Sequence, residues 1–178
     1  MDPSRRRLLA CIPLAALLPA CGFKPLLAER DDSPSVQAML AAIQINRIGD
    51  GRNRRLGQIM RNELIDRFST GSGLQPPRFV LDVTLTQRFT PLIIESSNTV
   101  TRSNLVMTAA FTLRDIESGD VLYRSTARST GSHDVVVSEY SSQVARQDTA
   151  RKAVRDLANT ITYLLSFHFD RAHEAAGS

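Results

Sequence analysis

The feature that most limits how this chain can fold is a run of small and apolar residues near its C-terminus. They recur at steps of three and four, the spacing that places side chains on one face of an α-helix. They are Ala150, Ala153, Val154, Leu157, Ala158, Ile161, Leu164 and Leu165. The opposite face is polar, with Arg151, Lys152, Arg155, Asp156 and Asn159. The pattern predicts a long helix that packs one stripe against a core.

Three segments before this helix alternate between apolar and polar residues, which is typical of strands with one buried face. The first contains Phe79, Leu81, Val83 and Leu85. The second contains Leu105, Met107, Ala109, Phe111 and Leu113. The third, Val121 to Arg128, follows the turn sequence ESGD, with Tyr123 and Ala127 on one face and Arg124 and Arg128 on the other. The last two segments therefore predict a hairpin.

A short strand and a second helix are predicted nearer the N-terminus. Ile43 and Ile45 alternate with polar residues. After a turn with Asp50 and Asn53 as candidate helix caps, apolar residues recur at helical spacing: Leu56, Ile59, Met60, Leu64 and Phe68. The order of strand, helix, three strands and helix predicts an α+β fold, a two-layer sandwich of about four strands with two helices on one face. We expect one domain over residues 36–170 and a disordered tail over 171–178.

The first twenty residues have the pattern of an export signal. Three arginines (Arg5, Arg6 and Arg7) precede the uncharged stretch LLACIPLAALL at 8–18, which is too short to span a membrane. The sequence LPAC at 18–21 then resembles a bacterial lipobox. The resemblance implies cleavage before Cys21, with a diacylglycerol and an N-acyl chain (such as palmitate) attached to that residue. Residues 21–35 are predicted to be the lipidated N-terminus and a polar tether.

Removal of residues 1–20 changes both the charge and the thiol content of the chain. The whole sequence has a net charge of +4, and the signal accounts for three arginines and one aspartate, so +2 remains. This balance gives little support to nucleic-acid binding. Cys11 leaves with the signal and Cys21 is alkylated, so no disulfide is expected.

No pattern in the sequence indicates catalysis or metal binding. The chain has no G-x-S-x-G, H-E-x-x-H or C-x-x-C motif. Its three histidines, His133, His168 and His173, have no spacing typical of metal ligands. We therefore expect a protein that is not an enzyme, with no catalytic residue, no metal and no cofactor beyond the lipid on Cys21.

Two apolar runs lie in predicted connections and are candidate contact surfaces. They are Leu92, Ile93 and Ile94, and Val135, Val136 and Val137. Alternatively, both runs extend the adjacent strands. If the strands at 79–85 and 105–113 form an extended hairpin, these runs and Arg88 or Arg102 would gather at its tip. Arg146 would enter the last helix from a nearby connection.

Taken together, these segments resemble the LptE family of LPS-assembly lipoproteins. The similarity lies in CGFKPL at 21–26, in the order of the elements, and in the alanine-rich helix that follows SEYSSQVARQDTA at 138–150. The resemblance implies an outer-membrane lipoprotein that plugs the β-barrel LptD, helps to assemble it and binds lipopolysaccharide (LPS). It places a ligand-binding basic residue near Arg146, with Arg88 and Arg102 standing in for a second one.

The resemblance also gives the polar face of the sheet a role, because a plug must match a polar barrel lumen. The face is predicted to carry Asp82, Thr84, Thr108, Thr112, Arg124 and Arg128. Ordinary solvation is the alternative explanation of this face. The domain would then lie on the periplasmic side of the outer membrane or within the barrel.

Two other functions compete with this one. The first is an accessory lipoprotein of an ABC or MCE-type phospholipid transport system, which would share the anchor and a small α+β domain. The second is a periplasmic hydrolase, which would require turnover of an ester, phosphoester or glycan substrate.

Overall fold

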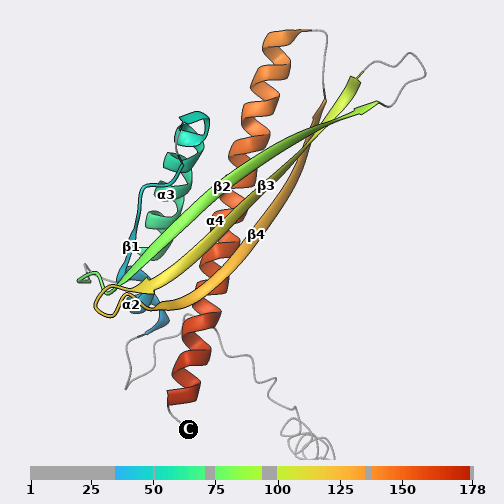
Figure 1. Cartoon of the computed structure of the whole chain (residues 1–178). Coiled ribbons are helices and arrows are strands. Elements are labelled where there is room, and N and C mark those ends of the chain that lie inside the picture. Colours follow the sequence, from blue (N-terminus) through green and yellow to red (C-terminus); the bar gives the residue numbers. More distant parts are fainter. Residues whose placement is uncertain (1–34, 50, 71–74, 94–99, 135–137, 177–178) are drawn as a thin grey trace, which may run out of the picture.

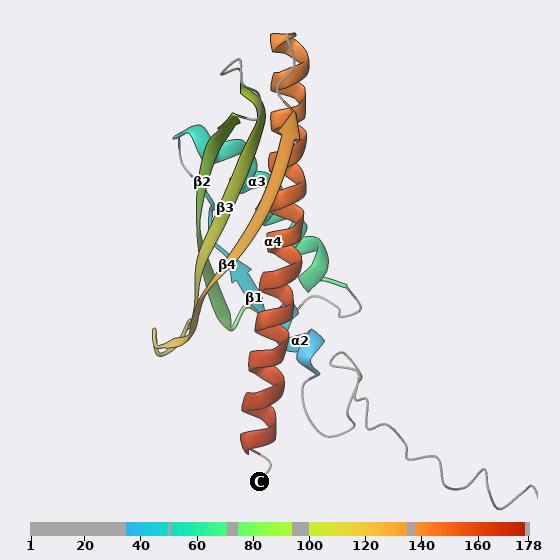
Figure 2. The same ribbon diagram turned by 90° about the vertical axis from the view of Figure 1, so that its right-hand side faces the viewer.

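The computed structural model describes residues 35–49, 51–70, 75–93, 100–134 and 138–176. In chain order the elements are α2 (Val36–Ala41), β1 (Ile43–Ile45), the 3-10 helix η2 (Gly51–Asn53), α3 (Arg54–Phe68), β2 (Phe79–Ile93), β3 (Val100–Asp115), β4 (Val121–Asp134) and α4 (Glu139–Ala176). The four strands form one mixed sheet in the order β1-β2-β3-β4. The helices cover one face of this sheet (Figures 1 and 2). The predicted two-layer α+β fold is confirmed.

The strands pair because each alternates apolar and polar side chains in matching register. β1 is parallel to β2, with Ile43 opposite Phe79. β2, β3 and β4 are antiparallel neighbours, and Leu85, for example, lies opposite Ala109, which lies opposite Ala127. The turn between β3 and β4 contains Gly119 at a φ of 75°, a conformation that favours glycine.

The core lies between the sheet and the helices. The sheet contributes the predicted inward residues of β2 and β3, which are all buried, and α4 contributes its apolar stripe. Leu157, Ile161 and Leu165 of this stripe are completely buried. α3 packs against α4 through Met60, Leu64 and Phe68, which are buried in the same cluster. Each fully buried aliphatic side chain contributes about 1.5–3 kcal/mol through the hydrophobic effect.

The structure differs from the sequence predictions at three places. The helix α2 was not predicted; Ser35 caps it, accepting a hydrogen bond from the backbone of Ala38, and only Val36 and Leu40 are buried, too few to show a period. β2, β3 and β4 are longer than expected. α4 includes residues 171–176, which had been assigned to a disordered tail, because packing continues past Leu165 to buried Phe169, whose ring centroid lies 5.3 Å from that of Phe79.

One of the two predicted helix caps, Asn53, lies at the expected position but does not cap the helix with its side chain. Asn53 occupies the N-cap position of α3, but its side chain makes no capping hydrogen bond. Its amide instead donates to the backbone oxygen of Leu85 at 3.3 Å and accepts from Gln87 at 2.9 Å, which fastens the start of α3 to β2. Asp50 lies outside the described residues.

Candidate functional site

A pocket of about 250 Å³ lies where α3, β2 and α4 meet. We call it the arginine pocket. Its lining residues are Arg55, Leu56, Ile59, Gln87, Phe89, Gln143, Arg146, Gln147, Ala150 and Arg151. The pocket combines apolar side chains with guanidinium and amide groups.

The pocket forms because the inward stripe of α4 changes character towards the start of the helix. From Ala150 onward the stripe is buried against the sheet. At the preceding positions of the same helical face stand Gln143, Arg146 and Gln147, which are exposed. These long polar side chains do not pack into a dry core, so a hollow remains above Phe89, the last aromatic residue on the inward face of β2.

Within the pocket, Arg146 lies against an aromatic ring. Its guanidinium carbon is 5.2 Å from the centroid of the Phe89 ring, a cation–π contact. The Phe89 ring also contacts His133 of β4. The two rings lie edge-to-face, with their centroids 6.0 Å apart. His133 is buried, and neither ring nitrogen has a hydrogen-bond partner within the described residues. Burial, followed by the positive charge of Arg146, lowers the pKa of His133, and Asp134 opposes this shift.

The guanidinium groups of the arginine pocket have no close ion-pair partner among the described residues, although the charge of Arg151 contributes to lowering the pKa of nearby Asp148. Arg55, Arg146 and Arg151 form no ion pair among them. Neighbouring cations on α4 do have partners, since Lys152 lies 2.8 Å from Asp148 and Arg155 lies 3.3 Å from Glu63. The pocket therefore offers three guanidinium groups to an anionic ligand, and guanidinium groups bind phosphate and carboxylate groups with two parallel hydrogen bonds.

The structure separates Arg146 from the other two arginines that were predicted to bind LPS. Arg88 and Arg102 lie on the opposite face of the sheet, because their positions alternate with the inward residues of β2 and β3. Arg102, near the end of the hairpin, forms an ion pair with Asp134 at 3.0 Å. Arg88 lies farther from the end of the hairpin, opposite Val106. The two-residue period of the strands therefore places Arg88 and Arg102 on the sheet face opposite Arg146, and their role in LPS binding stays a prediction.

The predicted interface residues lie at the far end of the β2–β3 hairpin or outside the described chain. Leu92 is half-buried and pairs with Arg102, and Ile93 pairs with Val100 after an irregularity in the register. Both belong to β2 and thus extend the strand, as one of the two interpretations held. Ile94 and residues 135–137 lie outside the described residues. A role of these residues in partner contact stays a prediction.

The sheet face opposite the helices is polar, as predicted. The register aligns Asp82 with Thr112 and Thr112 with Arg124, and it aligns Thr108 with Arg128. Asp82 is held by an ion pair with Arg114 and by a 2.7 Å hydrogen bond from Asn46. We call this surface the outer sheet face. Its polar side chains stand in rows across three strands, and no described element covers it (Figure 2).

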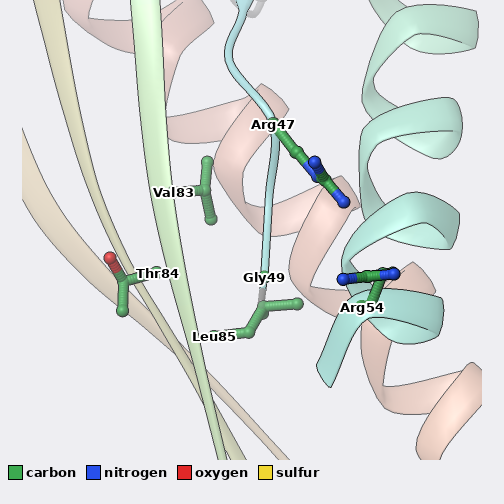
Figure 3. A pocket seen from close by; sticks show the side chains of 6 residues that line it. All are labelled: Arg47, Gly49, Arg54, Val83, Thr84 and Leu85. Carbon is green, nitrogen blue, oxygen red and sulfur yellow. The ribbon is translucent and has the colours of Figure 1, made fainter. Parts of the chain in front are cut away.

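A second cavity, of about 460 Å³, lies where the chain leaves β1 and separates from β2. It is lined by Arg47, Gly49, Arg54, Val83, Thr84 and Leu85. In Figure 3 the side chains of Arg47 and Arg54 extend towards each other beside α3. These two arginines were not predicted as site residues, because they come from an irregular segment and from the start of a helix, which are adjacent only in the fold.

Two further observations concern the described residues. Among them, no group of three or more histidine, cysteine, aspartate or glutamate side chains could hold a metal ion. The same part of the chain has no helix that is both long enough and apolar enough to cross a bilayer.

Most residues of the arginine pocket were not predicted from the sequence. Arg151 was predicted only as a polar position of the last helix, and neither Arg55 nor Phe89 was predicted as a site residue. The signal that could have found them is the sequence QVARQ at 143–147, where the inward face of the last helix becomes polar before the apolar stripe begins. Such a change indicates a gap between helix and sheet.

The fold is that of a class of small two-layer α+β domains known from bacterial lipoproteins. A solved structure from Caulobacter crescentus CB15, described as that of a lipoprotein, is 21% identical and superimposes with a TM-score of 0.58, covering 77% of this chain and 96% of that one. Rare lipoprotein B from Shewanella oneidensis is 10% identical, with a TM-score of 0.57 and coverage of 74% and 98%. No curated protein sequence matches the chain significantly.

Residues 40–165 match the family model LptE, which is described as lipopolysaccharide-assembly. The match covers all four strands, α3 and the part of α4 up to Leu165. The chain belongs to the LptE family of LPS-assembly proteins, as the sequence predicted.

Proposed function

We propose that this protein is an outer-membrane lipoprotein that plugs and helps to assemble the LPS-export β-barrel LptD and binds LPS as it is inserted into the outer leaflet. The match to the LptE family over residues 40–165 carries this proposal. The protein acts through binding and not through catalysis. Its domain lies on the periplasmic side of the membrane or within the barrel.

The arginine pocket supports direct binding of LPS. LPS carries phosphate groups beside acyl chains, so a site for it needs cations next to apolar surface. Arg146 lies directly over Phe89, and Leu56 and Ile59 line the same pocket. The guanidinium groups would bind a phosphate while an acyl segment contacts the apolar side chains. Arg88 and Arg102, if they take part, act from the other face of the sheet.

The outer sheet face supports the role of a plug. The lumen of an outer-membrane barrel is polar, so a domain inside it must present polar side chains over a broad surface. Rows of threonine and arginine across β2, β3 and β4 meet this requirement, with Thr112 between Asp82 and Arg124 as one example. Such side chains can exchange hydrogen bonds with a polar wall at little desolvation cost, because each keeps a partner.

The anchor in this proposal is Cys21, with residues 1–20 as its signal. Lipid chains contribute about 0.8 kcal/mol for each buried methylene, and two chains suffice for stable attachment. Residues 22–34 then join the lipid to the domain, with a reach of roughly 45 Å at full extension. The domain can therefore remain beside the membrane or enter a barrel there.

The test is isolation of the tagged full-length protein from its own membranes in mild detergent, followed by mass spectrometry. We expect a large outer-membrane β-barrel in a stoichiometric amount. Recovery of an inner-membrane transporter or an MCE-type protein in its place would overturn the proposal and favour a role in phospholipid transport. Recovery of a barrel partner without bound LPS would support the role as a plug and would contradict direct binding of LPS.

A further inference from the structure

The cavity of about 460 Å³ beside the end of β1 brings two arginines together from separate parts of the chain. We call it the edge cavity. Arg47 comes from the segment after β1, and Arg54 is the first residue of α3. Their side chains extend towards each other in front of β2 (Figure 3). The edge cavity shares no lining residue with the arginine pocket, so it is a separate feature of the surface.

The backbone on both sides of the edge cavity is held in place. Ile48 is buried, and Gly49 has a φ of 74°, at a position where a Cβ atom would lie 2.8 Å from the backbone oxygen of Asn53. The side-chain amide of Asn53 in turn donates to the backbone oxygen of Leu85 in β2. The segment 47–49, the start of α3 and β2 therefore fix one another, and both arginine side chains begin at set positions.

No described carboxylate pairs with the two arginines of the edge cavity. Neither forms an ion pair with a described residue, and α3 has no acidic residue in its first turn. Asp82, the acidic residue of β2 nearest to the cavity in sequence, is bound to Arg114 and Asn46. Asp50 lies outside the described residues and is therefore varied in the experiment. Two guanidinium groups that face each other repel unless an anion lies between them.

The edge of β2 adds hydrogen-bond donors to this cavity. Pairing with β1 ends where Leu81 accepts a hydrogen bond from the backbone of Asn46 at 3.0 Å. Alternate residues of a strand direct their main-chain groups to the same side, so the N–H groups of Val83 and Leu85 point to this edge too. No described strand continues the pairing beside them. The edge cavity thus combines two guanidinium groups with main-chain N–H groups, and both kinds of donor bind phosphate oxygens.

We propose that the edge cavity binds a phosphate group. Two guanidinium groups supply two positive charges and paired N–H donors, which suit the charge and the several oxygens of a phosphate. The sources of such a group are a phosphorylated lipid and free inorganic phosphate. LPS as the source rests on the proposed function, whereas the phosphate site itself does not.

The position of the edge cavity favours LPS as the source. Leu85 of this cavity and Phe89 of the arginine pocket both lie on the inward face of β2. Four residues of strand separate them, which is about 13 Å. A lipid that carries more than one phosphate group can therefore place one in each site.

The test is nuclear magnetic resonance of the arginine Nε–Hε groups in the lipidated full-length protein, held in detergent. Arg47→Gln and Arg54→Gln assign the two signals. The probes, added at constant ionic strength, are inorganic phosphate, lipid A (the lipid part of LPS) with its phosphate groups, and lipid A without them. The matched control for the Arg47→Gln, Arg54→Gln double variant is Arg78→Gln with Arg171→Gln, which removes two exposed charges far from the cavity.

We expect phosphorylated lipid A to shift both signals and dephosphorylated lipid A to leave them unchanged. The double variant should bind phosphorylated lipid A about tenfold more weakly than the parent, because charge-assisted hydrogen bonds are lost, and the control should bind like the parent. A response to inorganic phosphate alone would support the phosphate site and assign it to a free anion.

Several outcomes would contradict the phosphate site. Signals that respond to no probe, or equally to both forms of lipid A, would overturn it. A response that appears only in Asp50→Asn would also overturn it, because Asp50 would then be the partner of the two arginines. Lipid A that binds through Arg146 while these two signals stay unchanged would refute this inference and leave the proposed function intact. Signals that respond to inorganic phosphate in a protein that binds no LPS would contradict the proposed LPS binding alone.

Discussion

Gly57 of α3 lies so close to the segment after β1 that a Cβ atom at its position would be 2.0 Å from the backbone oxygen of Ile48. The close approach lets Arg61, one turn later, donate to the backbone oxygen of Ile45 at 3.2 Å. Glycine normally weakens a helix by about 1 kcal/mol relative to alanine. Here it is required because the backbone oxygen occupies the space that any side chain would need.

Gly57→Ala is expected to destabilise the domain by about 1–3 kcal/mol, in spite of the better helix propensity of alanine, because α3 must move away from Ile48. Urea unfolding followed by circular dichroism measures the change. Gln58→Ala, at the exposed neighbouring position, should lie within about 0.5 kcal/mol of the parent. A Gly57→Ala protein as stable as the parent would contradict the close approach.

Leu157→Asp should destabilise the domain by several kcal/mol, since Leu157 is fully buried and a carboxylate there would have no partner. Its control is Thr160→Asp on the exposed face of α4, for which we expect about 0.5 kcal/mol or less. Thermal unfolding of the two proteins gives the comparison. An unchanged melting temperature for Leu157→Asp would mean that the stripe does not form the core.

Arg146→Glu should weaken LPS binding without unfolding the protein, because it replaces a cation of the arginine pocket with an anion. Lys152→Glu makes the same change in charge at an exposed position outside the pocket, and it should bind LPS like the parent. Binding to immobilised LPS, with circular dichroism as a check on folding, decides between them. Equal losses in both variants would attribute binding to net charge and remove Arg146 from the site.

Cys21→Ala should abolish lipidation and release the protein from the membrane fraction, whereas Cys11→Ala should have no effect on the mature protein. Intact mass and fractionation are measured in cells that lack the barrel, so that a partner cannot retain the chain. Membrane retention of a secreted Cys21→Ala protein would be incompatible with the anchor.

His133 should make stability depend on pH. Its pKa is lowered in the folded protein, chiefly by burial and further by Arg146, so the unfolded chain binds a proton at higher pH than the folded one. The neutral imidazole makes its full contribution to the free energy of unfolding at pH values above 6.5, the ordinary pKa of histidine. This contribution is lost as the pH falls below 6.5 towards the lower pKa of the folded state. The loss cannot exceed about 1.4 kcal/mol for each pH unit and proton.

We therefore expect the urea concentration at the unfolding midpoint to decrease when the pH is lowered from 7 to 5. The decrease should be smaller in His133→Leu. Part of the dependence should remain in the variant, because burial also lowers the pKa of His168. An identical fall in the parent and the variant would show that His133 does not contribute.

The sequence predicted the layers of this fold better than the lengths of its elements. Periodicity identified the inward residues of β2, β3 and α4 because each is repeated often enough to show a face. The periodic pattern ended at residue 165 of α4, because beyond it Phe169 is the one buried apolar residue of the described chain, and it packs against Phe79 from a distant part of the sequence. Similarly, α2 depends on Val36 and Leu40 alone, and two residues do not define a period.

The candidate site was only partly predictable for a related reason. Arg146 followed from the family resemblance, but its neighbours Arg55 and Phe89 come from different elements and meet only through tertiary packing. The three arginines were predicted without the strand register, and the register places Arg88 and Arg102 on the other side of the sheet. Local patterns do not specify which side chains of separate elements converge.

The 38-residue helix α4 carries the arginine pocket at its N-terminal part, and it lines a groove with Phe167, His168 and Arg171 towards its C-terminus. At 1.5 Å per residue, Gln147 and Phe167 are separated by about 30 Å along a single rod. That separation is a property of helix geometry and is independent of loop conformation. α4 therefore holds the arginine pocket and this groove at a fixed distance from each other.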